Sequence, residues 1–229
     1  MKVLIRIVLL TIFYAVFFLD TTPAANSDDI AIIIKSKGVV KVRAAHTRKL
    51  RNAKPGMHLN SGDIIKTGNN ALIAIMFTDD KSLLKIRENS TIAINGKRTK
   101  STIAKKLKLA LGQIWVKVKK QYADFRVETP SGTAVVKGTE FYQIVDKDGN
   151  CIVIGIEGLV WLKNELGEIL IRAGETGLAN KLTAPTSHKT DSSEIPDWSK
   201  EENTEKCLQF EFEDSEGNKK GLKIKYEDN

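Results

Sequence analysis

The sequence predicts an all-β protein: a twisted, mainly antiparallel β-sandwich or barrel-like domain, followed by a polar linker and a C-terminal β-hairpin. Short runs of β-branched residues recur through most of the chain, and their length is that of strands rather than helices. Gly, Asn, Asp and Lys separate these runs. The 229 residues are 41% hydrophobic and 28% charged, as expected for a globular protein with one good core.

The first 25 residues carry the three parts of an export signal and are set apart from the fold. Lys2 and Arg6 give a short positive region, and Ile7 to Leu19 is an apolar run. Small residues suited to cleavage follow it, and we expect cleavage near Ala24 or Ala25, which would leave no stable membrane span. The alternative is an uncleaved anchor that carries Arg6 within its apolar stretch. Either way, we expect a periplasmic or cell-surface protein.

The first half of the chain contains a series of predicted strands. The run from Ala71 to Phe77 is apolar on both faces, which predicts an interior strand. By contrast, Leu84 to Arg87 alternates and suits a half-buried strand. Asn95-Gly96 is the strongest short hairpin signal. The predicted strands are Ile30 to Ile34, Val39 to Val42, Asp63 to Lys66, Ala71 to Phe77, Ser82 to Ile86 and Thr91 to Ile94.

The stretch Ser101 to Leu111 fits a short helix and a strand equally well, and Gly112 is expected to end it in either case. Strand patterns then resume at close spacing. Loop compositions at 146–150 and 163–167 predict two hairpins. Trp115 and Trp161 each lie in an apolar strand, which favours core packing. The predicted strands are Gln113 to Val118, Ala123 to Glu128, Ala134 to Lys137, Glu140 to Val145, Cys151 to Ile156, Val160 to Lys163 and Glu168 to Ile171.

The character of the chain changes after Leu182. Residues 183–204 are rich in Thr, Ser, Pro and charge, which predicts a linker with little fixed structure. Trp198 lies within it and is a candidate for contact with a partner, because an exposed aromatic side chain suits such a role. Residues 207–228 alternate apolar and charged positions around a turn, which predicts a hairpin that docks on the main sheet or on a partner. The predicted main domain spans residues 30–180.

Five segments, in order, resemble the FecR-like domain family. Gly62-Asp63-Ile64-Ile65-Lys66-Thr67-Gly68 is similar to the opening block of that family, and Asp79-Asp80 and Glu88-Asn89-Ser90 to its following turns. Thr129-Pro130 leading to Gly138-Thr139-Glu140-Phe141 resembles its central signature. Glu157-Gly158-Leu159-Val160 resembles its Glu-Gly-x-Val motif. Pro130 presets a turn and the glycines free the backbone, so these residues describe a scaffold.

The resemblance implies an all-β, mainly antiparallel domain. It also implies a place outside the inner membrane, where the best understood members relay a signal between an outer-membrane receptor and a cytoplasmic regulator in iron uptake. Those members carry a regulatory segment before a membrane span and a receptor-contacting domain after the FecR-like part. Only Met1 to Arg6 precede the apolar run here, so a stand-alone module of the cell envelope is expected.

Residues suited to catalysis or metal binding do not gather in the sequence. His46, His58 and His188 have unrelated contexts, so no metal and no cofactor are predicted. Asp79 and Asp80 with Glu88, or Glu140 with Glu157, are the only candidate carboxylate pairs for sugar hydrolysis, and turn or sheet positions explain them. We therefore expect no enzyme. Cys151 and Cys207 either form a disulfide or leave Cys151 as a small buried residue.

The net charge is +8, and the cations are concentrated in two stretches. Eight Lys or Arg and no acid lie between Asp29 and Asp63, and nine lie between Glu88 and Asp124. They suit an anionic polymer, lipid headgroups, or simply two solvated faces. Nucleic acid is disfavoured because the stretches lack interleaved aromatic residues. Two functions remain: a sensing or protein-interaction module with an envelope protein as partner, and a carbohydrate- or peptidoglycan-binding protein.

Overall fold

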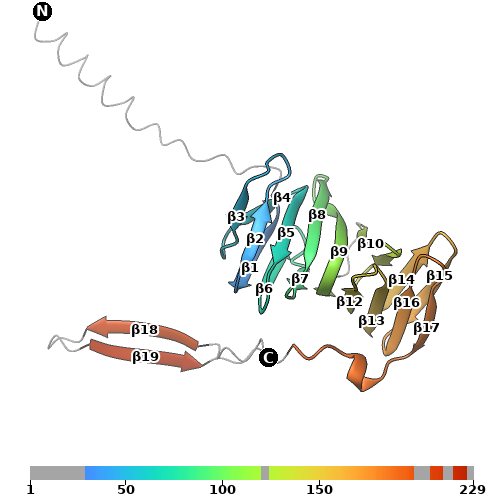
Figure 1. The fold of residues 1–229 in the computed structure, drawn as a ribbon. Coiled ribbons are helices and arrows are strands. Elements are labelled where there is room, and N and C mark those ends of the chain that lie inside the picture. The colour runs from blue at the N-terminus through green and yellow to red at the C-terminus, as the bar shows by residue number, and fades with distance from the viewer. Residues whose placement is uncertain (1–28, 120–123, 199–206, 214–218, 226–229) are drawn as a thin grey trace, which may run out of the picture.

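Strands β1 to β17 form one continuous sheet that folds over into two layers (Figure 1). The computed structural model describes residues 29–119 and 124–198, together with the backbone of residues 207–213 and 219–225. Pairing among the described strands is antiparallel apart from the parallel pair β9–β10. The all-β, mostly antiparallel class predicted from the sequence is confirmed.

Each layer has nine strands in its spatial order, and β9 belongs to both. Layer A consists of β4 (His58–Asn60), β1 (Asp29–Lys37), β6 (Leu72–Phe77), β7 (Leu83–Ile86), the second half of β9 (Ile103–Lys117), β12 (Glu140–Val145), β13 (Cys151–Glu157), β16 (Glu175–Ala179) and β17 (Thr186–Lys189). Layer B consists of β3 (Leu50–Asn52), β2 (Val40–Arg43), β5 (Asp63–Thr67), β8 (Thr91–Arg98), the first half of β9, β10 (Phe125–Thr129), β11 (Gly132–Val136), β14 (Leu159–Asn164) and β15 (Gly167–Arg172).

The stretch 101–111 is a strand, and the prediction that Gly112 ends it is wrong. Residues 103–111 of β9 pair with β8 and residues 112–117 pair with β12, so the strand passes from layer B to layer A at Gly112. Gly112 has a φ of 107°, and a Cβ there would lie 2.0 Å from Ser90 Oγ. Glycine therefore permits the crossing instead of stopping the strand.

The core lies between the two layers. Alternate residues of each strand point inward, and the rings of Phe77 in layer A and Phe125 in layer B meet edge to face with centroids 5.8 Å apart. The predicted interior strand is confirmed, because β6 is buried along almost its whole length between β1 and β7. The alternation predicted at Leu84 to Arg87 is confirmed in the burial of β7.

Asn95-Gly96 does not form the predicted hairpin turn, because β8 runs through both residues to Arg98. The turn comes later, where Thr99 N–H donates to Thr102 O at 2.8 Å. A Cβ at Gly96 would lie 2.8 Å from Ile103 Cγ2 and 2.9 Å from Ile30 Cγ2. The glycine thus serves close packing of β8 against its neighbour β9 and against β1 of the opposite layer.

The segment predicted as a linker has fixed structure in its described part, 183–198. Strand β17 pairs with β16, which extends the domain beyond residue 180. A short 3₁₀ helix, η1 (Ser192–Glu194), follows and is capped by Asp191. The predicted terminal hairpin forms separately from β18 (Cys207–Glu213) and β19 (Lys219–Lys225). Its docking stays a prediction, as does the signal at 1–25, which lies outside the described residues.

Candidate functional site

The residues of the opening motif hold turns together in layer B. The Asp63 side chain is buried and accepts hydrogen bonds from Asn60 N at 3.0 Å and Ala45 N at 3.2 Å. Thr67 Oγ1 donates to Arg87 O at 2.6 Å and accepts from Ser90 N at 2.9 Å. Gly62 and Gly68 flank this strand, and Gly62 has a positive φ of 90°. These side chains are occupied by backbone groups.

The central signature is used in the same way. Thr129 Oγ1 donates to Gly132 O at 2.8 Å and so closes the turn that Pro130 presets. Thr139 Oγ1 donates to Leu159 O at 3.0 Å, and Phe141 is fully buried. Close approach of the two loops that contain Gly138 and Gly158 requires both glycines, because a Cβ at Gly158 would lie 2.7 Å from Gly138 O. Glu157 is exposed and pairs in register with Glu140.

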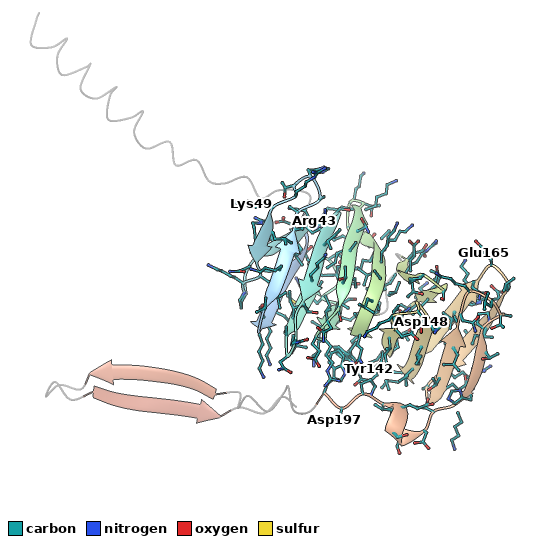
Figure 2. The ribbon with its side chains drawn as sticks, viewed as in Figure 1. Arg43, Lys49, Tyr142, Asp148, Glu165 and Asp197 are labelled. Atoms are coloured by element: carbon teal, nitrogen blue, oxygen red, sulfur yellow. The ribbon has the colours of Figure 1, made fainter. Side chains whose placement is uncertain are left out.

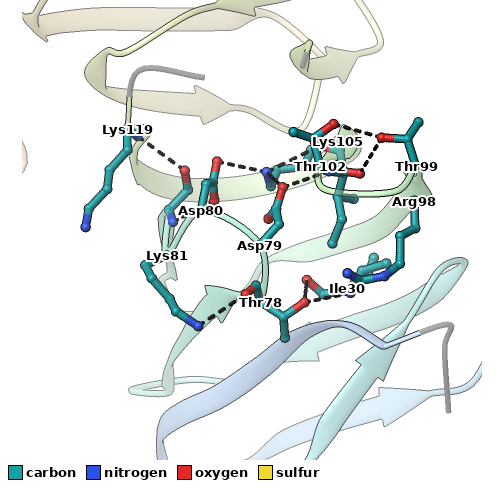
Figure 3. Close-up of polar contacts among 12 residues, drawn as sticks. Ile30, Thr78, Asp79, Asp80, Lys81, Arg98, Thr99, Thr102, Lys105 and Lys119 are labelled. Atoms are coloured by element: carbon teal, nitrogen blue, oxygen red, sulfur yellow. Dashed lines mark hydrogen bonds and ion pairs between the residues drawn. The ribbon is translucent and has the colours of Figure 1, made fainter. Parts of the chain in front are cut away.

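Asp79 and Asp80 form a buried ion cluster with Lys105 (Figure 3). Lys105 Nζ lies 2.9 Å from one oxygen of each carboxylate, and its side chain is fully buried. Burial alone would raise the pKa of Asp79. Hydrogen bonds from Lys105 and from Ile103 N–H, with the Lys105 charge, outweigh burial and hold that pKa below its ordinary value. The cluster joins the β6–β7 turn to β9.

The other carboxylates considered for hydrolysis are also occupied. Glu88 accepts from Asn70 N at 2.5 Å. Glu140 accepts from Trp115 Nε1 at 3.1 Å and pairs with Lys117 at 2.8 Å. Neither carboxylate pair is held in the open geometry that glycoside hydrolysis needs. Among the described residues, no group of three His, Cys, Asp or Glu side chains is arranged to hold a metal ion.

The outer face of layer B ends in an exposed apolar patch on the β14–β15 hairpin. The prediction of a core position for Trp161 is wrong: its side chain is 51% exposed, because Val160 and Leu162 take the inward positions. Trp161 lies directly opposite Leu170 in the register. Leu159, Leu166 and Leu170 are also exposed. Sequence alternation could not decide between the two faces, since both carry apolar residues.

A groove of about 650 Å³ runs beside this patch. The turn at Thr129–Thr133 forms one wall, the loop of the β14–β15 hairpin another, and Asn180 and Lys181 a third. Asn164 braces the hairpin, because its side chain donates to Asn180 O at 3.0 Å and accepts from Gly167 N at 3.1 Å. The lining offers backbone and amide groups and no paired acid and base, which suits binding more than catalysis.

The opposite end of layer B is cationic. Lys41 and Arg43 on β2 face outward beside Lys66 on β5, to which Lys41 is paired in register. Arg48 and Lys49 are exposed in the loop between β2 and β3, and Arg51 is exposed on β3. Figure 2 shows Arg43 and Lys49 at this end and Glu165 at the other. We call these six side chains the cationic end; they are Lys41, Arg43, Arg48, Lys49, Arg51 and Lys66.

Residues 190–198 form a strap that returns over the outer face of layer A, and Trp198 is not exposed as predicted. Trp198 is only 7% exposed. Its ring packs against Tyr142 at 5.7 Å between centroids, with the Arg87 guanidinium 5.7 Å from the ring centroid. Glu194 anchors the other end of the strap to Thr176 and His188, each at 2.8 Å. These intramolecular contacts explain the burial, and a role of Trp198 in partner contact stays a prediction.

Cys151 is a buried, free thiol that accepts a hydrogen bond from Gln143 Nε2 at 3.2 Å. Burial raises the pKa of the Cys151 thiol to about 11. The Cys207 side chain lies outside the described residues, so the disulfide stays a prediction. In the parts of the chain that are described, no helix is long and apolar enough to cross a membrane.

Comparison with known proteins identifies the domain. Residues 63–160 match the family model of the FecR protein. The fold is similar to a crystal structure, at 2.50 Å resolution, of a candidate anti-sigma factor from Parabacteroides distasonis, with a TM-score of 0.51 and 13% identity. That match covers 64% of this chain and 66% of the other, just under two thirds of its length. A second structure with the same description, at 1.65 Å, matches with a TM-score of 0.49 and 13% identity over the same shares. No curated protein matched the chain.

Proposed function

Because residues 63–160 of this chain are a FecR domain, we propose that the protein is an exported, non-enzymatic sensing or protein-interaction module of the cell envelope. Its partner is an envelope protein that offers an extended segment to strand β15. The export signal at residues 1–25 supports the location. The occupied carboxylates and the turn-forming motif residues support a scaffold without catalysis.

The observation that carries the proposal is an apolar cross-strand pair beside a sheet edge. Strand β15 pairs with β14 on one side in layer B, and no strand of the described residues pairs with its other side. Arg172 N–H donates to Glu175 Oε2 at 2.8 Å, which shows that this backbone group points away from β14. Since backbone direction repeats every two residues, the Leu170 N–H points to the same free edge.

A partner strand added at this edge would gain backbone hydrogen bonds from β15 and side-chain contacts from the apolar patch. Strand addition draws affinity from the main chain and specificity from side chains beside the edge. Trp161 and Leu170 lie opposite each other in a position without backbone hydrogen bonds, where side chains approach most closely. An aromatic side chain at such a place is typical of the residues that dominate binding energy.

The test is in-cell cross-linking of tagged full-length protein, followed by mass spectrometry of the captured proteins. We expect one specific envelope protein, and we expect Leu170→Pro to abolish its capture, since proline removes the outward N–H while the pairing with β14 is kept. Trp161→Ser should weaken capture strongly. Leu50→Ser is the matched control, because Leu50 is 50% exposed on β3 at the other end of the layer.

The alternative function is binding of carbohydrate or peptidoglycan, which the exposed Trp161 ring beside Lys163 favours. The two functions separate on the same variants. Leu170→Pro leaves the ring in place, so glycan binding would survive it while strand addition would not. Capture of cell-wall fragments alone, unaffected by Leu170→Pro and lost in Trp161→Ser, would replace the protein-interaction proposal with the glycan one.

A further inference from the structure

We propose that the cationic end of layer B docks on an anionic lipid surface. This inference concerns residues at the opposite end of the layer from β15 and goes beyond the proposed protein contact. It rests on three features: the grouping of six cations from four neighbouring segments, the engagement of the nearest carboxylates elsewhere, and the position of this end beside the start of β1.

The grouping arises from the topology and not from the sequence order alone. Lys41 and Lys66 are separated by 24 positions in the chain, yet they are register partners on the adjacent strands β2 and β5. Arg43 lies two residues further along the same outer face, opposite Leu50 of β3. The loop that carries Arg48 and Lys49 joins these two strands. A sheet face and its end loop therefore present their charges together.

The nearest carboxylates do not neutralise this end. No acid lies between Asp29 and Asp63 in the sequence. Asp63 is buried and holds Ala45 N and Asn60 N, as described above. Asp29 pairs with His58 at 2.7 Å. By contrast, the second basic stretch is balanced where it reaches β9 and β10, because Lys106 and Lys108 share Glu128 and Arg126 pairs with Asp124. The cationic end is thus the part of layer B with uncompensated charge.

The position of this end favours a lipid surface over a soluble polyanion. The loop residues Ala44 to Thr47 and Ile30 of β1 line one pocket, so the cationic loop lies beside the start of the described domain. The apolar run at 7–19 ends ten positions before Asp29. A fully extended chain of that length spans at most about 35 Å. Wherever that run meets a bilayer, the headgroups are within reach of the cationic end.

Electrostatic attraction sets the expected size of the effect. Each Lys or Arg close to an anionic leaflet strengthens binding about fivefold at physiological salt, so loss of three weakens it about a hundredfold. The attraction falls with the Debye length and should disappear at high salt.

The experiment is co-sedimentation of the full chain with two kinds of vesicle: phosphatidylcholine alone, and equal parts of phosphatidylcholine and phosphatidylglycerol. Any insertion of the apolar run contributes to both, so the ratio of the two partition coefficients reports the cationic end. We expect this ratio to fall about a hundredfold in the triple variant Arg48→Gln, Lys49→Gln, Arg51→Gln. The matched control neutralises three exposed lysines elsewhere: Lys147→Gln, Lys163→Gln, Lys181→Gln. It should keep the ratio near that of the unaltered chain.

An equal fall in both triple variants would mean that net charge alone acts, and the proposal would be wrong. A ratio near one for the unaltered chain would also overturn it. If the chain ignores the anionic vesicles but is retained on immobilised polyglucuronate, and only the first triple variant abolishes this retention, the cationic end serves an anionic glycan and not a lipid surface. Circular dichroism of all variants verifies that the β fold is intact.

Discussion

Replacing Lys105 by methionine tests whether the buried ion cluster holds layers A and B together. Methionine keeps most of the apolar stem that packs near the Phe77 ring, where Lys105 Nζ lies 5.2 Å from the centroid. It removes both contacts of 2.9 Å to Asp79 and Asp80 and a third, at 3.3 Å, to Ile103 O. The Asp79 side chain is only 2% exposed, so its carboxylate would be left buried without a counter-charge.

Removal of one partner from a buried pair costs about 3 to 5 kcal/mol, because the remaining charge stays desolvated. We expect this loss in the free energy of unfolding, measured by urea denaturation of the full chain. Asp80→Asn should cost less, since Asp80 is 13% exposed and Asp79 remains to pair with Lys105. Adding Asp79→Asn to Lys105→Met should recover part of the loss, because no stranded charge remains. A loss below about 1 kcal/mol, or strict additivity of the two changes, would refute the reasoning.

The same cluster gives a pH dependence with a definite sign. The folded-state pKa of Asp79 lies below its model value of 3.8. Asp79 therefore contributes stability above pH 3.8, and this contribution is lost as the pH falls through the folded-state pKa. Asp79→Asn should flatten the stability profile in that acidic window and leave its shape at neutral pH unchanged.

Three further changes test separate features. Gly112→Ala should cost about 3 kcal/mol or more in urea denaturation, from the positive φ and the clash with Ser90, whereas Gly174→Ala, at a φ of 79° in open space, should cost only about 1 kcal/mol; equal costs would contradict the crossing role of Gly112. In a Cys207→Ser chain, Cys151 should react with a thiol reagent at neutral pH only after unfolding, because its pKa is about 11; rapid reaction of the folded chain would show that Cys151 is accessible. Trp198→Ala should speed proteolysis within residues 190–198, with Ile195→Ala as the exposed control; equal rates for both would mean that Trp198 does not hold the strap.

The sequence predicted the strands well where one face is clearly apolar, and less well where a glycine has two uses. Asn95-Gly96 is a turn signal by composition, but Gly96 is needed for contact with Ile103 and Ile30. Gly112 would be a stop signal by composition, but it lies inside a strand of 15 residues. Local pattern records that a residue has no side chain. It does not record whether the turn or the neighbouring layer requires this.

The candidate site was predictable in composition and not in place. The excess of cations between Asp29 and Asp63 was visible, but only the pairing of β2 with β5 shows that Lys41 and Lys66 share a face. Trp161 lies in a run where both faces are apolar, so only the register with Leu170 and the burial of Val160 reveal its exposure. For Trp198, polar composition favoured an open linker, whereas the long-range contacts with Tyr142 and Arg87 cannot be read from nearby residues.

The shared strand β9 gives the two proposed contact surfaces a fixed relation. The cationic end lies on strands that precede β9 and the apolar patch on strands that follow it, so the two surfaces communicate through this strand and its neighbours. Lys105 anchors the first half of β9 to the β6–β7 turn, and Gly112 carries the strand into the other layer. A module that reads a partner at one end while it rests on a lipid surface at the other needs such rigidity, because each contact would otherwise lose its orientation to the other. Gly112→Ala should therefore weaken partner capture only to the extent that it unfolds the domain, whereas Leu170→Pro should abolish capture in a folded one.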